Sequence, residues 1–274
     1  HPDRREALLF DDIIFEVDAR EEHVAMCSLF EAALPAGGRV FEITDLFTDA
    51  FGVDDARRYF IDTLIRRLPE LRLAPYRDRL LDLAPVDLTR FAVEGQIPGS
   101  PDLALDPSPN LLFTRDLAAV VRDRILLSRA AKPARARESI LMDTLVRFHP
   151  LFAGVAASAI RIPVHDTIEG GDILVASPDC VLIGMSERTS FSGVMQAASQ
   201  LLDIGVKDIL IVDIPKQRSS MHLDTIFTFA HPHECVVFAP AITDRADNVV
   251  RLTREEGRLV TTLRPSLQAA LQES

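Results

Sequence analysis

Residues 169–185 read EGGDILVASPDCVLIGM, and this stretch decides the class of fold. Two short apolar runs, 172–176 and 180–185, are typical of strands. Helical spacing follows over 191–204, and another apolar run covers 209–213. A succession of strand, strand, helix and strand predicts an α/β protein.

The same alternation continues on either side of this stretch. A helical pattern covers 19–34 and another covers 136–147, and residues 49–97 have the spacing of several amphipathic helices. We therefore predict a helical insertion over 49–102 in a main domain formed by 1–48 and 103–274. Further strands are predicted at 8–17, 39–44, 110–114, 118–121, 125–128, 160–164, 226–229 and 235–239, and a final helical pattern at 263–271.

Composition excludes several classes of function. The chain has 274 residues, 47% of them hydrophobic, so it can bury a full core. Its net charge of -11 argues against nucleic-acid binding, which requires lysine and arginine to displace counterions. No apolar run is long enough to span a membrane. The three cysteines, without CxxC spacing, indicate neither disulfides nor a zinc cluster, and a reducing cytoplasm fits best.

The first polar cluster is Met221-His222-Leu223-Asp224-Thr225. If this segment is extended, His222 and Asp224 point to the same side of the backbone. Such a pair can hold a cation through the carboxylate and exchange a proton through the imidazole. The alternative is a strand end with an ordinary surface histidine and a turn aspartate.

A second cluster is Glu169-Gly170-Gly171-Asp172. Adjacent glycines permit backbone conformations that are closed to other residues and let a ligand approach closely. Because the flanking carboxylates are anionic, we expect a cation rather than a phosphate, although a glycine turn with acidic neighbours explains the pattern equally. Asp116, after the run Leu111 to Phe113, adds a further carboxylate or is simply a loop residue.

Two arginines complement these acidic groups. Arg135 lies in Pro133-Ala134-Arg135-Ala136-Arg137-Glu138, at the start of a predicted helix, and Arg188 follows a predicted strand. Arginine can grip a carboxylate through two parallel hydrogen bonds, so either could hold the acid end of a small zwitterion. Most arginines, however, only solvate a surface.

Six motifs in order resemble the arginine deiminase family of guanidine-modifying enzymes. They are NLLFTRD at 110–116, PARARE at 133–138, FHP at 148–150, EGGD at 169–172, GMSERTS at 184–190 and MHLDT at 221–225. The resemblance runs from about residue 8 to residue 274. It implies a pentein fold, a five-fold α/β propeller of ββαβ modules around a central active site. It also implies hydrolysis of L-arginine to L-citrulline and ammonia without metal or organic cofactor.

The resemblance also implies roles for single residues. Asp116 and Asp224 would clamp the guanidinium, with Glu169 as a further carboxylate. His222 would protonate the departing ammonia and then activate water, while Asp172 would orient the imidazole. The substrate α-carboxylate would be held by Arg135 and Arg188 with Asn110, and Phe113 would pack on the aliphatic part of the substrate.

One expected part is absent from the sequence. The family attacks the guanidinium carbon with a cysteine near its C-terminus, and none of Cys27, Cys180 and Cys235 matches that motif. We expect that the last module is missing because the chain is truncated or processed, or else that the protein is a divergent homologue without activity. The alternatives to a deiminase are a non-catalytic arginine- or guanidinium-binding protein and a hydrolase or amidinotransferase acting on another guanidine. The amphipathic surface of the helical insertion is compatible with a homo-oligomer.

Overall fold

The computed structural model describes residues 7–9, 14–97 and 103–274. The chain divides into two compact units, unit 1 over 1–112 and unit 2 over 113–274. Each is described by itself. Unit 2 carries most of the predicted polar clusters.

Unit 1 is helical in its described part. Its helices are α1 (Glu16–Ala33), α2 (Ile43–Phe51), α3 (Asp54–Arg67), α4 (Arg77–Leu81) and α5 (Pro85–Glu94). The aromatic faces of α2 and α3 meet where the rings of Phe51 and Phe60 lie 5.1 Å apart, and both side chains are fully buried. Helix α1 differs from the others because it buries none of its residues.

The helical patterns predicted over 19–34 and 49–97 are confirmed, but two predicted strands of unit 1 are wrong. Helix α2 begins at Ile43, inside the strand predicted over 39–44. The strand predicted over 8–17 falls partly on residues 10–13, outside the described residues, and α1 already begins at Glu16. In both cases a short apolar run carried too little periodicity to distinguish a strand from the start of a helix.

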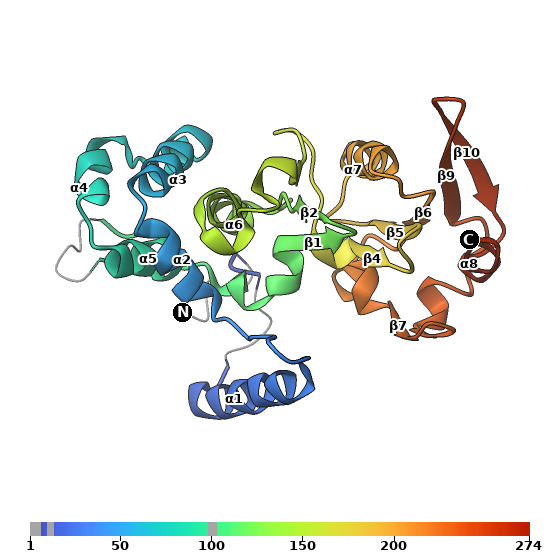
Figure 1. The fold of residues 1–274 in the computed structure, drawn as a ribbon, viewed down its shortest axis with the longest axis horizontal. Helices are drawn as coiled ribbons and strands as arrows, with labels where there is room; N and C mark the ends of the chain where they lie inside the picture. The colour runs from blue at the N-terminus through green and yellow to red at the C-terminus, as the bar shows by residue number, and fades with distance from the viewer. Residues whose placement is uncertain (1–6, 10–13, 98–102) are drawn as a thin grey trace. The chain divides into compact units, whose positions relative to one another are not determined.

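Unit 2 contains a repeated ββαβ arrangement (Figure 1). In the first repeat, strands β1 (Ala118–Val121) and β2 (Arg124–Leu127) form a hairpin. Helix α6 (Ala136–Phe148) then connects β2 to the parallel strand β3 (Ile160–Arg161).

The second repeat is built in the same order. Strands β4 (Ile173–Val175) and β5 (Cys180–Met185) pair antiparallel, and helix α7 (Phe191–Asp203) leads to β6 (Asp208–Asp213), which is parallel to β5. The two helical crossovers between parallel strands confirm the predicted α/β class.

A five-stranded sheet forms the centre of unit 2, in the order β10-β9-β6-β5-β4. Strands β9 (Val249–Glu255) and β10 (Arg258–Arg264) pair as a hairpin, and β9 runs antiparallel to β6. Strands β7 (Phe227–His231) and β8 (Glu234–Val237) form a separate hairpin, and α8 (Leu267–Glu273) is the last helix. The sheets are open.

Both faces of the central sheet are covered, which explains why β5 and β6 are almost entirely apolar. On one face, Val181 and Ile209 pack with Ala197 of α7. On the other face, Leu182 and Leu210 pack with residues of β7 and α8. A charged substitution in these two strands would therefore enter a core on either side.

The remaining predictions for unit 2 have mixed outcomes. The strand predicted over 110–114 is wrong, because 109–112 and 114–117 form short 3-10 turns. The helical pattern over 263–271 is only partly right, since β10 extends to Arg264. The division into 1–48 with 103–274 and an insertion over 49–102 stays a prediction.

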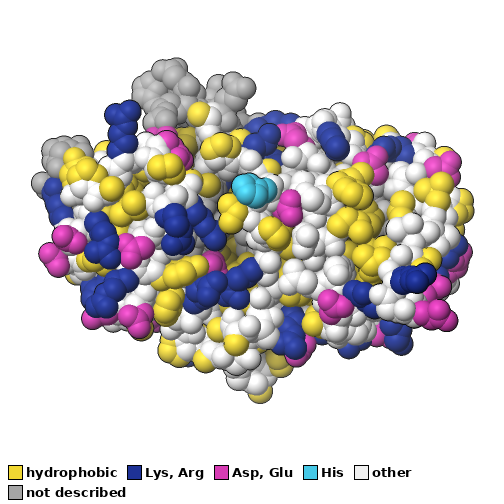
Figure 2. All heavy atoms as spheres, turned by 90° about the horizontal axis from the view of Figure 1, so that it is seen from above, with side chains coloured by type: hydrophobic (Ala, Val, Ile, Leu, Met, Phe, Trp, Pro, Cys, Tyr) yellow, Lys and Arg dark blue, Asp and Glu magenta, His cyan; other side chains and the backbone are white. Residues whose placement is uncertain are grey.

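The surface carries charged and apolar side chains together. Figure 2 shows acidic and basic groups between yellow apolar patches on the face that it views. In unit 2 the large apolar side chains Phe191 and Phe238 are more than half exposed, at 64% and 54%. No described helix combines the length and the apolar character needed to cross a membrane.

Candidate active site

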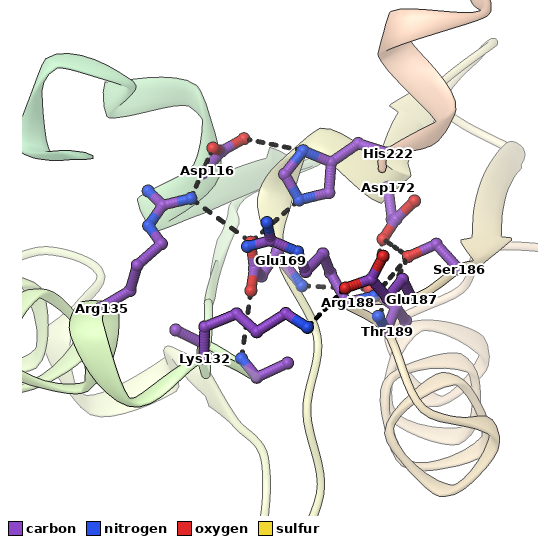
Figure 3. A network of polar contacts seen from close by, with 12 residues as sticks. Asp116, Lys132, Arg135, Glu169, Asp172, Ser186, Glu187, Arg188, Thr189 and His222 are labelled. Carbon is purple, nitrogen blue, oxygen red and sulfur yellow. Dashed lines mark hydrogen bonds and ion pairs between the residues drawn. The ribbon is translucent and has the colours of Figure 1, made fainter. Parts of the chain in front are cut away.

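Three polar segments of unit 2 occupy corresponding places in its topology. Asp116 lies in the turn just before β1, Glu169 to Asp172 precede β4, and His222 to Asp224 precede β7. Each segment thus leads directly into the first strand of a hairpin. The structure brings Asp116, Glu169 and His222 together, as Figure 3 shows.

The imidazole of His222 lies between two of these carboxylates. Its Nε2 is 2.9 Å from Oε2 of Glu169, and its Nδ1 is 3.5 Å from Oδ1 of Asp116. Burial alone would lower the pKa of His222, but the hydrogen bond to Glu169 and the charges of Asp172, Asp116 and Glu169 raise it. The site therefore stabilises the protonated imidazolium, the form that can donate a proton.

Glu169 is the carboxylate with the most partners. Its Oε1 accepts a hydrogen bond from the backbone N–H of Ala131 at 3.0 Å, while Oε2 faces His222 and Arg135. Burial raises the pKa of Glu169, but the hydrogen bond and charge of His222, the charge of Arg135 and the Ala131 amide together bring it below its usual value. Glu169 is therefore held as an anion although it is buried.

The guanidinium of Arg135 is surrounded by carboxylates. Its Nη1 donates to Asp116 at 2.7 Å and to Glu169 at 3.3 Å, and its Nε donates to Glu138 at 2.8 Å. The side chain is 4% exposed. The cluster thus already binds a planar cation, and the predicted role of Arg135 in holding a substrate carboxylate stays a prediction.

Glu138 is a member of the site that sequence reasoning missed. It lies one helical turn after Arg135 in the PARARE motif, and that i,i+3 spacing was the available signal. Burial raises the pKa of Glu138 to about 7, against the lowering effect of Arg135. Glu138 can therefore carry a proton near neutral pH.

Asp172 acts as a structural acceptor. Its Oδ2 accepts hydrogen bonds from the hydroxyls of Ser186 and Thr189, both at 2.6 Å, and its Oδ1 accepts the backbone N–H of Leu223 at 2.9 Å. Burial raises the pKa of Asp172 to about 6. Asp172 thus bonds to the backbone of the residue that follows His222, and its predicted role in orienting the imidazole stays a prediction.

The two glycines before Asp172 are needed for close packing. A Cβ on Gly171 would lie 2.8 Å from Cγ of His222 and 2.9 Å from Oδ1 of Asp116, and one on Gly170 would lie 2.2 Å from the carbonyl oxygen of Arg115. Neither glycine has a positive φ. The glycines therefore do not use the backbone freedom that they permit, and their absent side chains make room for the protein's own groups.

Asp224 is the most open of the predicted carboxylates, with 28% of its side chain exposed. Leu223 to Thr225 form a 3-10 turn, so the predicted extended segment is wrong beyond His222. Arg115 lies 3.8 Å from Asp224 and donates to the carbonyl of Ile173 at 2.5 Å. The pKa of Asp224 is raised above its ordinary value, mainly by burial. The charge of His222 lowers this pKa, and the charge of Asp116 raises it.

Arg188 differs from Arg135 because one of its hydrogen-bond donors has no acceptor among the described residues. It lies in the loop between β5 and α7, is 4% exposed and approaches Glu169 only to 3.8 Å. Its Nε has no hydrogen-bond partner among the described residues. A buried guanidinium with an unpaired donor is suited to receive an anionic group from a ligand.

The two remaining predicted residues occupy different environments. Phe113, at the start of unit 2, is 48% exposed. Asn110 belongs to unit 1, where it is buried and its amide donates to the carbonyl of Leu8 at 2.9 Å. Their predicted contacts with a substrate stay predictions.

Asp116, Glu169 and His222 also have the donor atoms for a metal ion, since one atom from each lies within 4.8 Å of the others. Arg135, however, already supplies a positive charge to both carboxylates. The positive guanidinium repels a divalent cation more strongly than a singly charged group. The two carboxylates are therefore better matched to the protonated imidazole or to a second flat monocation.

The larger cavity of unit 2 lies elsewhere. It has a volume of about 600 Å³ between β7, β8 and α8, and its lining includes Cys180 and Cys235 but none of the predicted site residues. Burial raises the pKa of the Cys180 thiol to about 11, so Cys180 is not a thiolate at neutral pH.

Comparison with known proteins agrees with the motifs. The family model of arginine deiminase matches residues 83–274. The arginine deiminase of Rhodococcus erythropolis is 31% identical over 292 residues, covering 98% of this chain and 70% of the relative. That of Limosilactobacillus fermentum is also 31% identical, over 299 residues, covering 100% and 72%.

Among solved structures, DDAH from Pseudomonas aeruginosa in complex with citrulline is 26% identical over 44% of each chain, with a TM-score of 0.37. The family model and the two curated relatives together confirm the resemblance seen in the six motifs: the chain belongs to the arginine deiminase family.

Proposed function

We propose that this protein hydrolyses the guanidinium group of L-arginine, giving L-citrulline and ammonia. One observation carries the proposal: a protonatable histidine lies between the buried Glu169 and the partly buried Asp116, two carboxylates that already bind a guanidinium, that of Arg135. The arginine deiminases to which the chain is similar support this choice of substrate.

In the proposed complex, Asp116 and Asp224 clamp the substrate guanidinium, with Glu169 as a further anion. A thiolate forms a bond to the guanidinium carbon, and one nitrogen leaves as ammonia with a proton from His222. The neutral imidazole then takes a proton from water, whose oxygen bonds to the same carbon as the carbon–sulfur bond breaks. The carboxylates stabilise the cationic covalent intermediate.

The substrate carboxylate is assigned first to Arg188. Its unpaired Nε leaves a donor for the ligand, whereas Nε and Nη1 of Arg135 already bind carboxylates. Asn110, Arg135 and Phe113 are the further substrate contacts that we propose. Loss of one charged hydrogen bond of this kind costs about 1.5–3 kcal/mol.

The nucleophile is not assigned to a cysteine of this chain. Cys180 and Cys235 line the cavity between β7, β8 and α8, and Cys27 lies on α1 of unit 1. This arrangement favours one alternative specifically: a homologue that binds arginine or another guanidine without turning it over. A hydrolase or amidinotransferase acting on another guanidine is the remaining alternative.

The order of the ββαβ repeats supports a pentein architecture, a five-fold propeller to which unit 2 contributes. A further module that carries the nucleophile is part of the proposal. We also propose a cytoplasmic location, consistent with three unbridged cysteines, and no nucleic-acid or membrane partner. The exposed Phe191 and Phe238 are compatible with a homo-oligomer.

Calorimetry and citrulline detection test the proposal together. Arginine should bind, and Asp224→Asn should weaken binding at least about tenfold, because the partly exposed carboxylate loses its charge. Agmatine, which lacks the carboxylate, should bind to the wild type more weakly than arginine does. Its affinity should be the same for the wild type and for Arg188→Gln. Lack of arginine binding, together with no citrulline from the full-length gene product, would refute the function. Binding without turnover by that full-length product would instead establish the binding homologue.

A further inference from the structure

Three metal-binding side chains meet in unit 1, outside the candidate active site. His23 and Cys27 are four residues apart on α1, so both lie on one face of that helix. Glu42 is the residue immediately before α2. One donor atom from each side chain lies within 4.8 Å of the other two.

The contacts among the three groups compete for one ring nitrogen. Nε2 of His23 is 3.1 Å from Oε1 of Glu42 and 3.5 Å from Sγ of Cys27. If Nε2 carries a proton, it can donate to the carboxylate but has no lone pair for the thiol. If it is unprotonated, it can accept from the thiol but has no proton for Glu42.

A metal ion satisfies all three donors at once. Zinc bonds of about 2.0–2.1 Å to nitrogen, 2.3 Å to sulfur and 2.0–2.2 Å to carboxylate oxygen give tetrahedral edges of about 3.3–3.6 Å. The observed separations of 3.1 and 3.5 Å are close to these edges. Two of the three donor separations therefore fit a zinc site, and the thiol and the carboxylate lie within 4.8 Å of each other.

The surroundings of Glu42 and α1 agree with such a site. The carboxylate of Glu42 does not cap α2, although this residue occupies the N-cap position. Helix α1 buries none of its residues, so little apolar burial among the described residues fixes its position. The cluster links this helix to the start of α2.

We propose that His23, Cys27 and Glu42 bind a zinc-type divalent cation that holds α1 to the start of α2 within unit 1. Imidazole, thiolate and carboxylate together select zinc or a similar transition metal over calcium or magnesium. His23 and Glu42 have side chains 41% and 55% exposed, so water can fill the fourth position. The sequence did not reveal the site because Glu42 is far from the i,i+4 pair and forms no known motif with it.

The first experiment titrates the metal-free chain with zinc chloride in a calorimeter, and with cobalt chloride in a spectrophotometer. We expect one tight site, release of protons as the thiol and imidazole lose them, and a thiolate-to-cobalt charge-transfer band. Cys27→Ser and Glu42→Gln should each weaken binding at least about 100-fold, because loss of an outer partner alone costs about 10–100-fold. Cys235→Ser, at the exposed cysteine of β8, is the matched control and should bind as the wild type does.

The variants should fold normally because none of the three side chains is buried, and circular dichroism checks this. Zinc should also protect Cys27, but not Cys235, from alkylation. The proposal is wrong if the chain shows no tight zinc site. It is equally wrong if zinc binding survives Cys27→Ser unchanged or if the cobalt complex lacks the thiolate band.

Discussion

The imidazole of His222 fits beside Asp116 only because position 171 carries no side chain. This glycine has an ordinary backbone conformation, and its role is steric. The distance between the imidazole and the carboxylate therefore depends on a residue that takes no part in the chemistry. Such a constraint can be tested by adding a single methyl group.

Gly171→Ala should lower the unfolding free energy by about 1–3 kcal/mol, the usual cost of overpacking, and should weaken arginine binding because the ring of His222 must move. Gly154→Ala is the control, since a Cβ at Gly154 meets nothing within 4 Å. Urea unfolding and calorimetry measure both effects. Equal behaviour of the two variants would contradict the steric role.

Sequence reasoning named Asp116, Glu169 and His222 correctly as neighbours because each stands in a motif whose order is recognisable. It missed the pairing of Arg135 with Glu138, although both lie in PARARE. Residue spacing shows that two side chains can meet on a helix, but it does not show which carboxylates approach the arginine from other parts of the chain.

The loop between β5 and α7 is the element that connects the carboxylate cluster with Arg188. Thr189 carries the connection: its hydroxyl donates to Asp172 at 2.6 Å and accepts the backbone N–H of Glu169 at 3.2 Å. One side chain thus joins the loop to both acidic residues of the EGGD segment.

Thr189→Val should lower the unfolding free energy by about 1–3 kcal/mol, because the methyl group leaves the buried amide of Glu169 without its partner and removes one of the hydrogen bonds to the Asp172 carboxylate. Arginine binding should weaken as well, because the loop also carries Arg188. Thr261→Val, at an exposed position of β10, is the matched control. Denaturant unfolding and calorimetry are the measurements, and an unaltered Thr189→Val variant would disprove the connection.

Elements were predicted well where a buried run was long or strongly periodic. Strand β5 and helix α7 match their predicted ranges to within a residue, because apolar side chains dominate them. The hairpin β9–β10 was missed because it buries only two of its residues, so its apolar positions form no long buried run. The 3-10 turn at 109–112 was read as part of a strand, and the turn at 223–225 was considered as an extended segment, because so short a turn has no periodicity of its own.

At the scale of the whole molecule, buried ionisable groups make stability depend on pH, and three of them share one direction of shift. The pKa values of Glu138, Asp172 and His222 are all raised, to about 7 for Glu138 and about 6 for Asp172. A raised pKa in the folded state gives a contribution that is present below the unfolded value and is lost as pH rises through the folded value. The contributions of Glu138 and Asp172 therefore decrease as pH rises towards neutral, and that of His222 decreases as pH rises above its unfolded value of 6.5.

The unfolding free energy should fall between pH 5 and pH 8, and the fall should be smaller in Glu138→Gln, which cannot ionise at that position. Glu255→Gln, at an exposed end of β9, is the control and should keep the wild-type slope. Urea titrations at several pH values measure this. The Glu138 contribution would be disproved if the wild type and Glu138→Gln had the same slope.

Asp116 lies just before β1, Glu169 before β4 and His222 before β7. Each of the three residues therefore belongs to a different hairpin. A partly folded chain, or one in which a hairpin has opened, keeps isolated charges but cannot assemble the ion network. Ligand affinity in this protein therefore reports on the completeness of folding in unit 2. A guanidinium ligand would bind only molecules with all three strand entries in place, and could be used to separate those molecules from misfolded ones.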